Sequence, residues 1–329
     1  MIPIVDLHCD LLSFLAEKPS HTTEDPGSNA SYPQMKQGNV TLQTLAIFTD
    51  SSPSSFLNGK KQLEALKRIL TEESDRYQLF DPSTDFTKSH KAISIIPAFE
   101  NASGFSSDET SLDQALSYLD SVLNTFKRIL YISLTWDGEN RFGGGNGSKK
   151  GLKEDGKLAL QWMHEKKIAI DLSHTSDFLA DDILNYLDKK SLKVPVLASH
   201  SNARSVTNKE RNLPDFLIKE IITRKGVIGL NFFAPFIGKE SKELIKHVEH
   251  IFFLQGEDSL CFGADFFPDL LSSYVQTKYQ SDFSFFKELN NSSCYPRALT
   301  LLQEHLDLKD DVLQKIAHKN FQAYTAKNL

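Results

Sequence analysis

Short apolar runs recur along the 329-residue chain, and most segments between them carry apolar residues at every third or fourth position. Such runs are typical of strands buried in a parallel sheet, and the wider spacing is typical of helices with one apolar face. The pattern predicts eight strands, within residues 2–10, 40–48, 93–99, 129–134, 168–172, 194–198, 227–230 and 260–263. It predicts helices at residues 60–77, 111–126, 155–165, 175–187, 214–224, 240–253, 296–305 and 310–321.

Eight strands that alternate with helices are typical of an α/β protein built as a (β/α)8 TIM barrel. One such barrel accounts for residues 1–329 as a single domain, with a long loop excursion at about residues 266–293. A doubly wound sheet is the alternative, but no Gly-x-Gly-x-x-Gly follows the first strand. The Gly-rich segment 143–147 lacks the Gly-Lys-Ser/Thr of a phosphate loop, so we expect a flexible active-site or surface loop there.

Composition narrows the class of protein. The chain is 40% hydrophobic and 24% charged, which is ordinary for a soluble globular enzyme, and its net charge of −6 argues against a nucleic-acid surface. Three cysteines cannot form a disulfide framework, and no apolar run approaches the ~20 residues that span a membrane. The first strand begins so early that no room is left for a signal peptide. We therefore expect a reduced, cytoplasmic protein that binds neither nucleic acid nor a membrane.

Ionisable side chains follow most of the predicted strands. Residues two apart on a strand share a face, so His8 and Asp10 at the end of the first strand point the same way. The other strand ends supply Glu100 after the third strand, His174 after the fifth, His200 after the sixth and Asp265 after the eighth. In a barrel these ends meet at one mouth, where barrel enzymes keep their chemistry. The pattern therefore predicts one site built from six potential ligands.

Six ligand-type side chains exceed the needs of a single catalytic zinc, which usually takes three protein ligands and leaves a place for water. They suit two ions, which lie ~3.5–4 Å apart in binuclear hydrolases and need a bridging group. Glu100 is the natural bridge, because its carboxylate has two oxygens.

Several motifs, read together, resemble the membrane dipeptidase (renal dipeptidase) family of the amidohydrolase superfamily. The resemblance runs from the first strand to the eighth, and the Asp-Leu-Ser-His element with the two motifs that follow it is the specific part. The motifs are Asp6-Leu7-His8-Cys9-Asp10, Ala98-Phe99-Glu100, Asp171-Leu172-Ser173-His174, Ser199-His200-Ser201, Arg211-Asn212-Leu213-Pro214-Asp215 and Gly263-Ala264-Asp265.

The resemblance implies a metallo-dependent hydrolase barrel with two zinc ions per subunit. One ion would take His8, Asp10 and Glu100, and the other would take Glu100, His174 and His200. Asp265 corresponds to the acid that handles the proton, and Arg211 to the group that binds the substrate's carboxylate. The implied reaction is hydrolysis of a dipeptide by a hydroxide that bridges the ions, with Asp265 and Glu100 as catalytic residues. A homodimer is also implied.

The chain departs from the family pattern at the pocket. Trp136 follows the fourth strand where many relatives have a His that contacts the reacting carbonyl, and an indole cannot carry a proton back and forth. Asn231 ends the seventh strand, before Phe232 and Phe233, where a Tyr is common in place of the second Phe. We take Trp136 and Asn231 as further candidates for substrate binding. His247 and His250 lie on a predicted outer helix, and we expect both to be exposed.

Two other functions remain open on the sequence. Another amidohydrolase, a deacetylase or lactonase acting on a small carboxylated substrate, would share the metal ligands and differ in the pocket. A binding barrel without catalysis would share only the fold, and the complete ligand set argues against it.

Overall fold

A ring of parallel strands forms the centre of the molecule. The computed structural model describes residues 1–86, 91–107, 109–268 and 272–328. Around the ring the strands follow the order β7-β6-β5-β4-β2-β1-β9-β8. Their bounds are β1 Ile4–Cys9, β2 Val40–Phe48, β4 Ile93–Glu100, β5 Tyr131–Ser133, β6 Ala169–Asp171, β7 Val196–Leu197, β8 Ile228–Leu230 and β9 Leu260–Phe262. The predicted (β/α)8 barrel is confirmed.

The first and last strands of that order meet through the backbone. Ala198, just after β7, forms a parallel bridge with Ile228 of β8. The Ala198 N–H donates to the carbonyl of Val227 at 2.9 Å, and the Gly229 N–H donates to the carbonyl of Ala198 at 2.8 Å. These bonds close the ring, so the carboxyl ends of all the barrel strands face one mouth.

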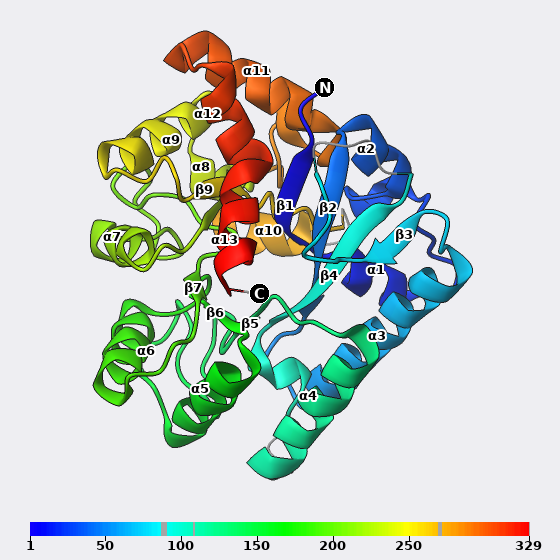
Figure 1. Cartoon of the computed structure of the whole chain (residues 1–329), viewed down its shortest axis with the longest axis vertical. Helices are drawn as coiled ribbons and strands as arrows, with labels where there is room; N and C mark the ends of the chain where they lie inside the picture. The colour runs from blue at the N-terminus through cyan, green and yellow to red at the C-terminus, as the bar shows by residue number, and fades with distance from the viewer. Residues whose placement is uncertain (87–90, 108, 269–271, 329) are drawn as a thin grey trace.

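Helices surround the ring (Figure 1). Apolar side chains at helical spacing bury one face of each long helix against the strands, as Leu119 and Val122 do in α4. The helices are α1 Leu11–Glu17, α2 Tyr32–Gln37, α3 Ser55–Glu72, α4 Leu112–Phe126, α5 Glu154–Lys166, α6 Asp177–Lys190, α7 Asp215–Thr223, α8 Ala234–Ile237, α9 Glu243–Phe253, α10 Ser272–Tyr279, α11 Tyr295–Leu306, α12 Asp310–Gln314 and α13 Asn320–Asn328.

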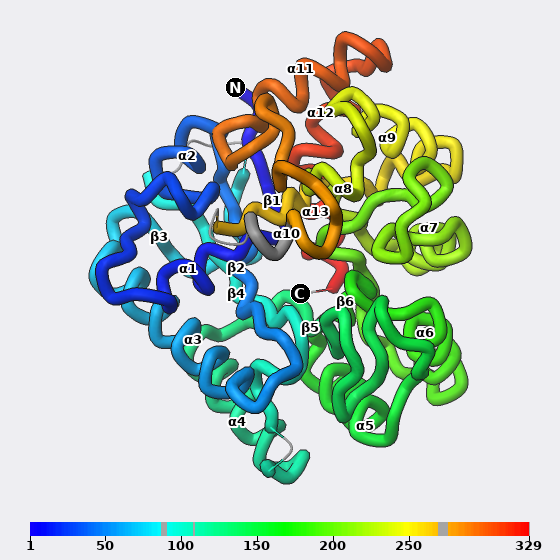
Figure 2. The backbone as a smooth tube through the Cα atoms, turned by 180° about the vertical axis from the view of Figure 1, so that it is seen from behind, coloured from blue at the N-terminus to red at the C-terminus, as the bar shows by residue number. Residues whose placement is uncertain are grey.

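The two ends of the barrel are covered differently. Phe321 and Tyr324 of α13 are buried in one cluster with Leu7 and Ile96 from strands β1 and β4. This apolar plug fills the interior, which leaves the chemistry to the strand ends at the opposite mouth. Figures 1 and 2 show α13 on one side of the barrel and α10 on the other.

Some predicted elements differ from the observed ones. The helix predicted at residues 60–77 runs from Ser55 to Glu72, and Tyr77–Leu79 forms an additional strand, β3, beside β4. The excursion predicted at 266–293 contains α10, and Phe285 in the same segment pairs with Phe233. Propensity alone could not separate these short elements from loops, because tertiary pairing stabilises them.

The expectation of an exposed His247 is wrong. His247 is fully buried on the inner face of α9; its Nδ1 accepts the Ala203 N–H at 3.1 Å and its Nε2 donates to the Ile237 carbonyl at 2.9 Å. Burial lowers the pKa of His247 to about 4. The ring thus stays neutral and ties α9 to the loops after β7 and β8. His250 lies at the helix surface and contacts Asp215 at 2.8 Å.

The length and hydropathy of a helix decide whether it can span a membrane. Each helix in the described part of the chain is too short or too polar to cross a bilayer.

Candidate active site

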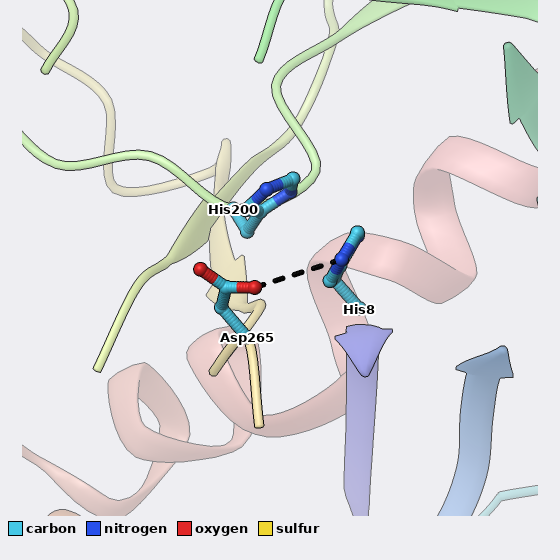
Figure 3. A group of neighbouring side chains, drawn as sticks. All are labelled: His8, His200 and Asp265. Atoms are coloured by element: carbon cyan, nitrogen blue, oxygen red, sulfur yellow. Dashed lines mark ion pairs between the residues drawn. The ribbon is translucent and has the colours of Figure 1, made fainter. Parts of the chain in front are cut away.

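The six predicted ligands converge at the barrel mouth, and all are buried. His8 and Glu100 are strand residues, Asp10 directly precedes α1, and His174, His200 and Asp265 follow strands. Figure 3 shows His8 at the tip of β1, facing His200 and Asp265. His8 Nε2 lies 3.7 Å from Asp265 Oδ1 and 3.8 Å from Asp10 Oδ1. The structure therefore brings together every ligand that the sequence nominated.

Glu100 lies between two groups of ligands. Its Oε2 is 3.1 Å from His8 Nε2. Its Oε1 is 2.9 Å from His174 Nε2 and 3.6 Å from His200 Nε2. The two oxygens of one carboxylate thus face different histidines. Ligand atoms of His8, Asp10 and Glu100 lie within 4.8 Å of one another, and so do those of Glu100, His174 and His200.

All three histidines have Nδ1 engaged away from the cluster. Nδ1 of His8 is 2.7 Å from the Tyr131 hydroxyl, which itself donates to the Leu7 carbonyl at 3.1 Å. Since that hydroxyl donates to Leu7, it accepts from Nδ1. Nε2 is then the nitrogen that faces Glu100, where it can bind an ion or, without one, a proton. A ligating histidine needs this tautomer, with the far nitrogen held by an acceptor.

The other two imidazoles follow the same rule. His200 Nδ1 is 2.6 Å from Ser199 Oγ, which donates to Asp171 at 2.6 Å. His174 Nδ1 is 3.2 Å from an oxygen of Asp137. The two Nε2 atoms are then left 3.0 Å apart with their lone pairs facing each other. This arrangement is repulsive unless a cation or a proton binds to these lone pairs.

The unpaired polar atoms of the cluster also fit cations. His8 Nε2, Asp10 Oδ1 and Glu100 Oε2 are buried and have no hydrogen-bond partner within the described residues. Burying such atoms without partners is costly. Imidazole nitrogens and carboxylate oxygens are the donors that zinc takes in catalytic sites. The residues present therefore fit the metal ions that the fold class uses.

Charge and burial shift the acidities of the cluster in opposite directions. Burial alone would lower the pKa of His8, but the negative charge of Glu100, 3.1 Å away, raises that pKa to about 10. Burial would raise the pKa of Glu100, but the charge of His8 and the close contacts with His174 and His200 hold it well below its usual value. Without an ion, a proton on His8 thus takes the place of a cation beside Glu100.

Asp265 differs from the other carboxylates. Burial raises its pKa to about 6, against the opposing pull of His8. Its Oδ2 accepts from Asn231 Nδ2 at 2.9 Å, and its backbone is left-handed with φ 64°. Asn231 therefore holds Asp265 in place, a role closer to positioning than the substrate contact expected from the sequence.

Arg211 lies beside the cluster and is 7% exposed. Its guanidinium donates to Ser201 Oγ and to the His200 carbonyl, both at 2.9 Å, and lies 5.6 Å from the Phe236 ring centroid. Its Nε has no hydrogen-bond partner in the described part of the chain. A buried cation with an unused donor is suited to an anionic group of a ligand.

Trp136 lies in the wall of a small pocket above the cluster. The pocket holds about 60 Å³ and has Asp10, Glu100, His174 and Asp265 at its polar end. The Trp136 ring meets Phe48 edge-on, with centroids 5.2 Å apart. The sequence-based placement of Trp136 at the site agrees with this position.

Two buried carboxylates that the sequence analysis did not nominate support the ligands. Asp171 accepts the backbone N–H of Ser173 at 3.0 Å and of Ser199 at 2.8 Å, which fixes the residues just before both His174 and His200. Asp6 accepts the N–H of His8 at 2.8 Å. A signal was present, because both aspartates stand two or three positions before a histidine ligand.

Comparisons with known proteins show the family and the fold of the chain. The family model described as "Membrane dipeptidase (Peptidase family M19)" matches residues 1–326. Among curated proteins, an uncharacterized dipeptidase of Schizosaccharomyces pombe is 24% identical over 73% of this chain and 61% of its own length. The dipeptidase tcpJ of Claviceps purpurea is 27% identical over 66% of this chain and 50% of its own length. The chain thus spans about half to two thirds of these two relatives.

Solved structures show the same fold. A metallo peptidase from Rhodobacter sphaeroides, liganded with a phosphinate mimic of the dipeptide L-Ala-D-Ala, superposes with a TM-score of 0.82 at 20% identity, covering 100% of this chain and 99% of that one. The dipeptidase AC, a metallo peptidase of family M19, gives a TM-score of 0.81 at 21% identity, covering 99% and 98%.

Proposed function

This chain belongs to the membrane dipeptidase family (peptidase family M19), which makes it a hydrolase of the metallo-dipeptidase class, and we propose that it cuts dipeptides with two zinc ions bound at the barrel mouth. The observation that carries the proposal is the position of Glu100: its Oε2 lies 3.1 Å from His8 Nε2, and its Oε1 lies 2.9 Å from His174 Nε2 on the other side. One carboxylate can serve two ions only in this position.

His8, Asp10 and Glu100 would hold one ion, and Glu100, His174 and His200 the other. Bound zinc would lower the pKa of a coordinated water to near neutral pH and would act as a Lewis acid on the scissile carbonyl. The protein's part is to fix the ligands. Tyr131, Ser199 and Asp137 do so by holding the Nδ1 atoms, and Asp171 and Asp6 by holding the backbone near the ligands.

Asp265 would move the proton. Its carboxylate lies beside the cluster, 3.7 Å from His8 Nε2, where it can accept a proton and give it up again to the leaving amine. Asn231 keeps one carboxylate oxygen in place at 2.9 Å, so the other oxygen remains directed at the cluster.

Arg211 would bind the free carboxylate of the dipeptide. Its buried guanidinium lies beside the metal cluster, and a charge-assisted contact there would fix the distance from the scissile bond to the C-terminus. Phe236 supports the guanidinium from one side. Homodimerisation and a cytoplasmic location remain predictions from the family resemblance and the sequence.

The experiment compares L-Ala-L-Ala, its C-terminal amide and N-acetyl-alanine as substrates of the zinc-loaded enzyme. We expect the dipeptide to be hydrolysed and its amide to be poor, because the amide lacks the carboxylate one residue beyond the scissile bond. N-acetyl-alanine keeps that carboxylate and lacks the free amine of a dipeptide. Preference for N-acetyl-alanine would instead favour a deacetylase. Metal binding without hydrolysis of any substrate would favour a binding barrel.

A further inference from the structure

The pocket above the ligand cluster has aromatic walls. Beyond the four acidic and histidine side chains at its polar end, the described residues that line it are all aromatic. They are Phe48, Trp136, Phe233, Phe236, Phe267 and Tyr279. Aromatic side chains offer large apolar surfaces and few hydrogen-bond partners, so this wall suits apolar parts of a ligand.

The barrel topology places the wall on two opposite sides. Phe48 ends β2 and Trp136 follows β5, the strands on either side of β4. Phe233 and Phe236 follow β8, which lies across the ring from β4 in the strand order. The Phe48–Trp136 pair therefore faces the Phe233–Phe236 pair across the mouth.

Arg211 distinguishes the two sides. Its guanidinium lies 5.6 Å from the Phe236 ring. If Arg211 holds the C-terminal carboxylate, the C-terminal residue of the dipeptide lies on the Phe236 side of the metal ions. The side chain of the N-terminal residue then faces Phe48 and Trp136.

Helix α10 adds a roof to the pocket. The Tyr279 ring packs against Phe233 at 5.1 Å and against Phe236 at 5.5 Å. Lys278 forms an ion pair with Asp137, and its Nζ lies 5.0 Å from the Trp136 ring. The cation on this roof is thus already neutralised by Asp137. A charged or amide side chain that lies against the described aromatic walls would lose much of its water, which is costly.

Phe48 also separates the pocket from a second hollow. That hollow, of about 630 Å³, includes Phe48 in its lining together with polar residues such as Asp50, Asn58 and Gln62. Phe48 therefore lies between the small aromatic pocket and a larger hollow whose lining includes polar residues.

We propose that this pocket selects dipeptides with an apolar side chain on the N-terminal residue, and that Phe48 and Trp136 are the residues that determine this specificity. The inference rests on the proposed dipeptidase function and on the carboxylate-binding role of Arg211. It adds the substrate class that the aromatic wall accepts.

The test compares L-Leu-L-Ala, L-Asn-L-Ala and L-Asp-L-Ala, whose N-terminal side chains have similar shapes and different polarity. We expect kcat/KM for Leu-Ala to exceed that for Asn-Ala by about 10-fold or more, the scale on which apolar pockets discriminate, with Asp-Ala poorer still. Equal values for Leu-Ala and Asn-Ala would overturn the inference while leaving the dipeptidase function intact. Hydrolysis of none of the three would contradict the dipeptidase function and this inference with it.

The Phe48→Ser variant is the second part of the test, because the smaller side chain opens the pocket toward the larger hollow. The Leu-Ala to Asn-Ala ratio should fall about 10-fold, partly through a gain on Asn-Ala, which misfolding cannot produce. Phe48→Val should shift the ratio in the same direction by less. Phe283→Ala is the control. It removes an aromatic residue of segment 266–293 that is 49% exposed and lies outside the pocket lining, so it should leave the ratio unchanged. An unchanged ratio in both Phe48 variants would overturn the role of Phe48.

Discussion

The Tyr131 hydroxyl accepts a hydrogen bond from His8 Nδ1 at 2.7 Å and donates one to the Leu7 carbonyl at 3.1 Å. Tyr131 lies on β5 and His8 on β1, so the bond crosses the interior of the barrel. It selects the tautomer in which Nε2 of His8 faces Glu100. The metal-binding state of His8 is therefore set by a tyrosine that is not itself one of the predicted ligands.

Tyr131→Phe should weaken metal binding. Loss of the acceptor frees the His8 tautomer, and loss of such outer contacts typically lowers metal affinity about 10- to 100-fold. Competition with a chromophoric zinc chelator measures this affinity directly. Tyr324→Phe is the matched control, since the buried Tyr324 hydroxyl has no hydrogen-bond partner in the described structure. Equal zinc affinity of the two variants would contradict the role given to Tyr131.

Asp265→Asn should lower kcat by roughly 10²–10⁴, the usual scale of general acid–base catalysis, while the metal content stays nearly intact. The reason is that His8, Asp10, Glu100, His174 and His200 remain as ligands. Steady-state kinetics and elemental analysis of the same preparation check both parts. Asp215→Asn, at a carboxylate on α7 that pairs with His250, should change neither. Metal loss as the main effect of Asp265→Asn would make Asp265 a structural ligand.

Arg211→Met should lower kcat/KM for a dipeptide by a few kcal/mol of transition-state binding, as expected for a lost charge-assisted contact. Its discrimination between a dipeptide and the dipeptide amide should nearly vanish, because the penalty falls only on the carboxylate form. Arg224→Met removes an arginine paired with Asp188 at the end of α7 and should keep the discrimination. A variant at Arg211 that still prefers the acid would exclude this residue as the carboxylate-binding group.

His247 predicts a pH effect on stability. Its pKa is about 4 in the folded protein, against 6.5 as its ordinary value, so the unfolded chain binds the proton more readily. The stabilising contribution is therefore present above pH 6.5 and is lost as the pH falls toward 4, by up to about 3 kcal/mol. Denaturant unfolding of the metal-free protein and of His247→Asn, from pH 7 to pH 4.5, measures it.

The variant has its own expected signature. His247→Asn should be less stable at pH 7, because two buried hydrogen bonds are lost or weakened. Its stability should fall less steeply with acid, so the difference between the two proteins should shrink toward pH 4.5. A constant difference in stability across this range would mean that the pKa of His247 is the same in the folded and unfolded states.

The strand ends were predictable because apolar runs stop where the buried strand stops. His8, Glu100 and Asp265 could therefore be placed at one mouth before any coordinates, once eight strands suggested a barrel. The same reasoning could not find the partner of each Nδ1. Tyr131 reaches His8 from another strand, and the Ser199 hydroxyl, although next to His200 in the chain, is oriented by Asp171 of β6. Such contacts depend on the tertiary arrangement and leave no periodic signal in the sequence.

The helices illustrate the same limit. The burial of His247 depends on which face of α9 meets the barrel loops, and a spacing of three residues does not specify that face on its own. Helix α10 was concealed in an irregular excursion because its stability comes from contacts such as Tyr279 with Phe233. That residues 1–329 form a single domain stays a prediction.

The central claim is that one carboxylate, Glu100, serves two zinc ions, and the most direct measurement is metal stoichiometry. Metal-free protein and its Glu100→Gln variant are titrated with zinc and analysed for bound metal per chain after gel filtration. The account predicts two ions in the unmutated protein and disturbed binding of both in the variant, because Glu100 Oε2 faces His8 and Oε1 faces His174. A fully active protein with a single ion, or a variant that loses only one ion and binds the other normally, would contradict the bridged site.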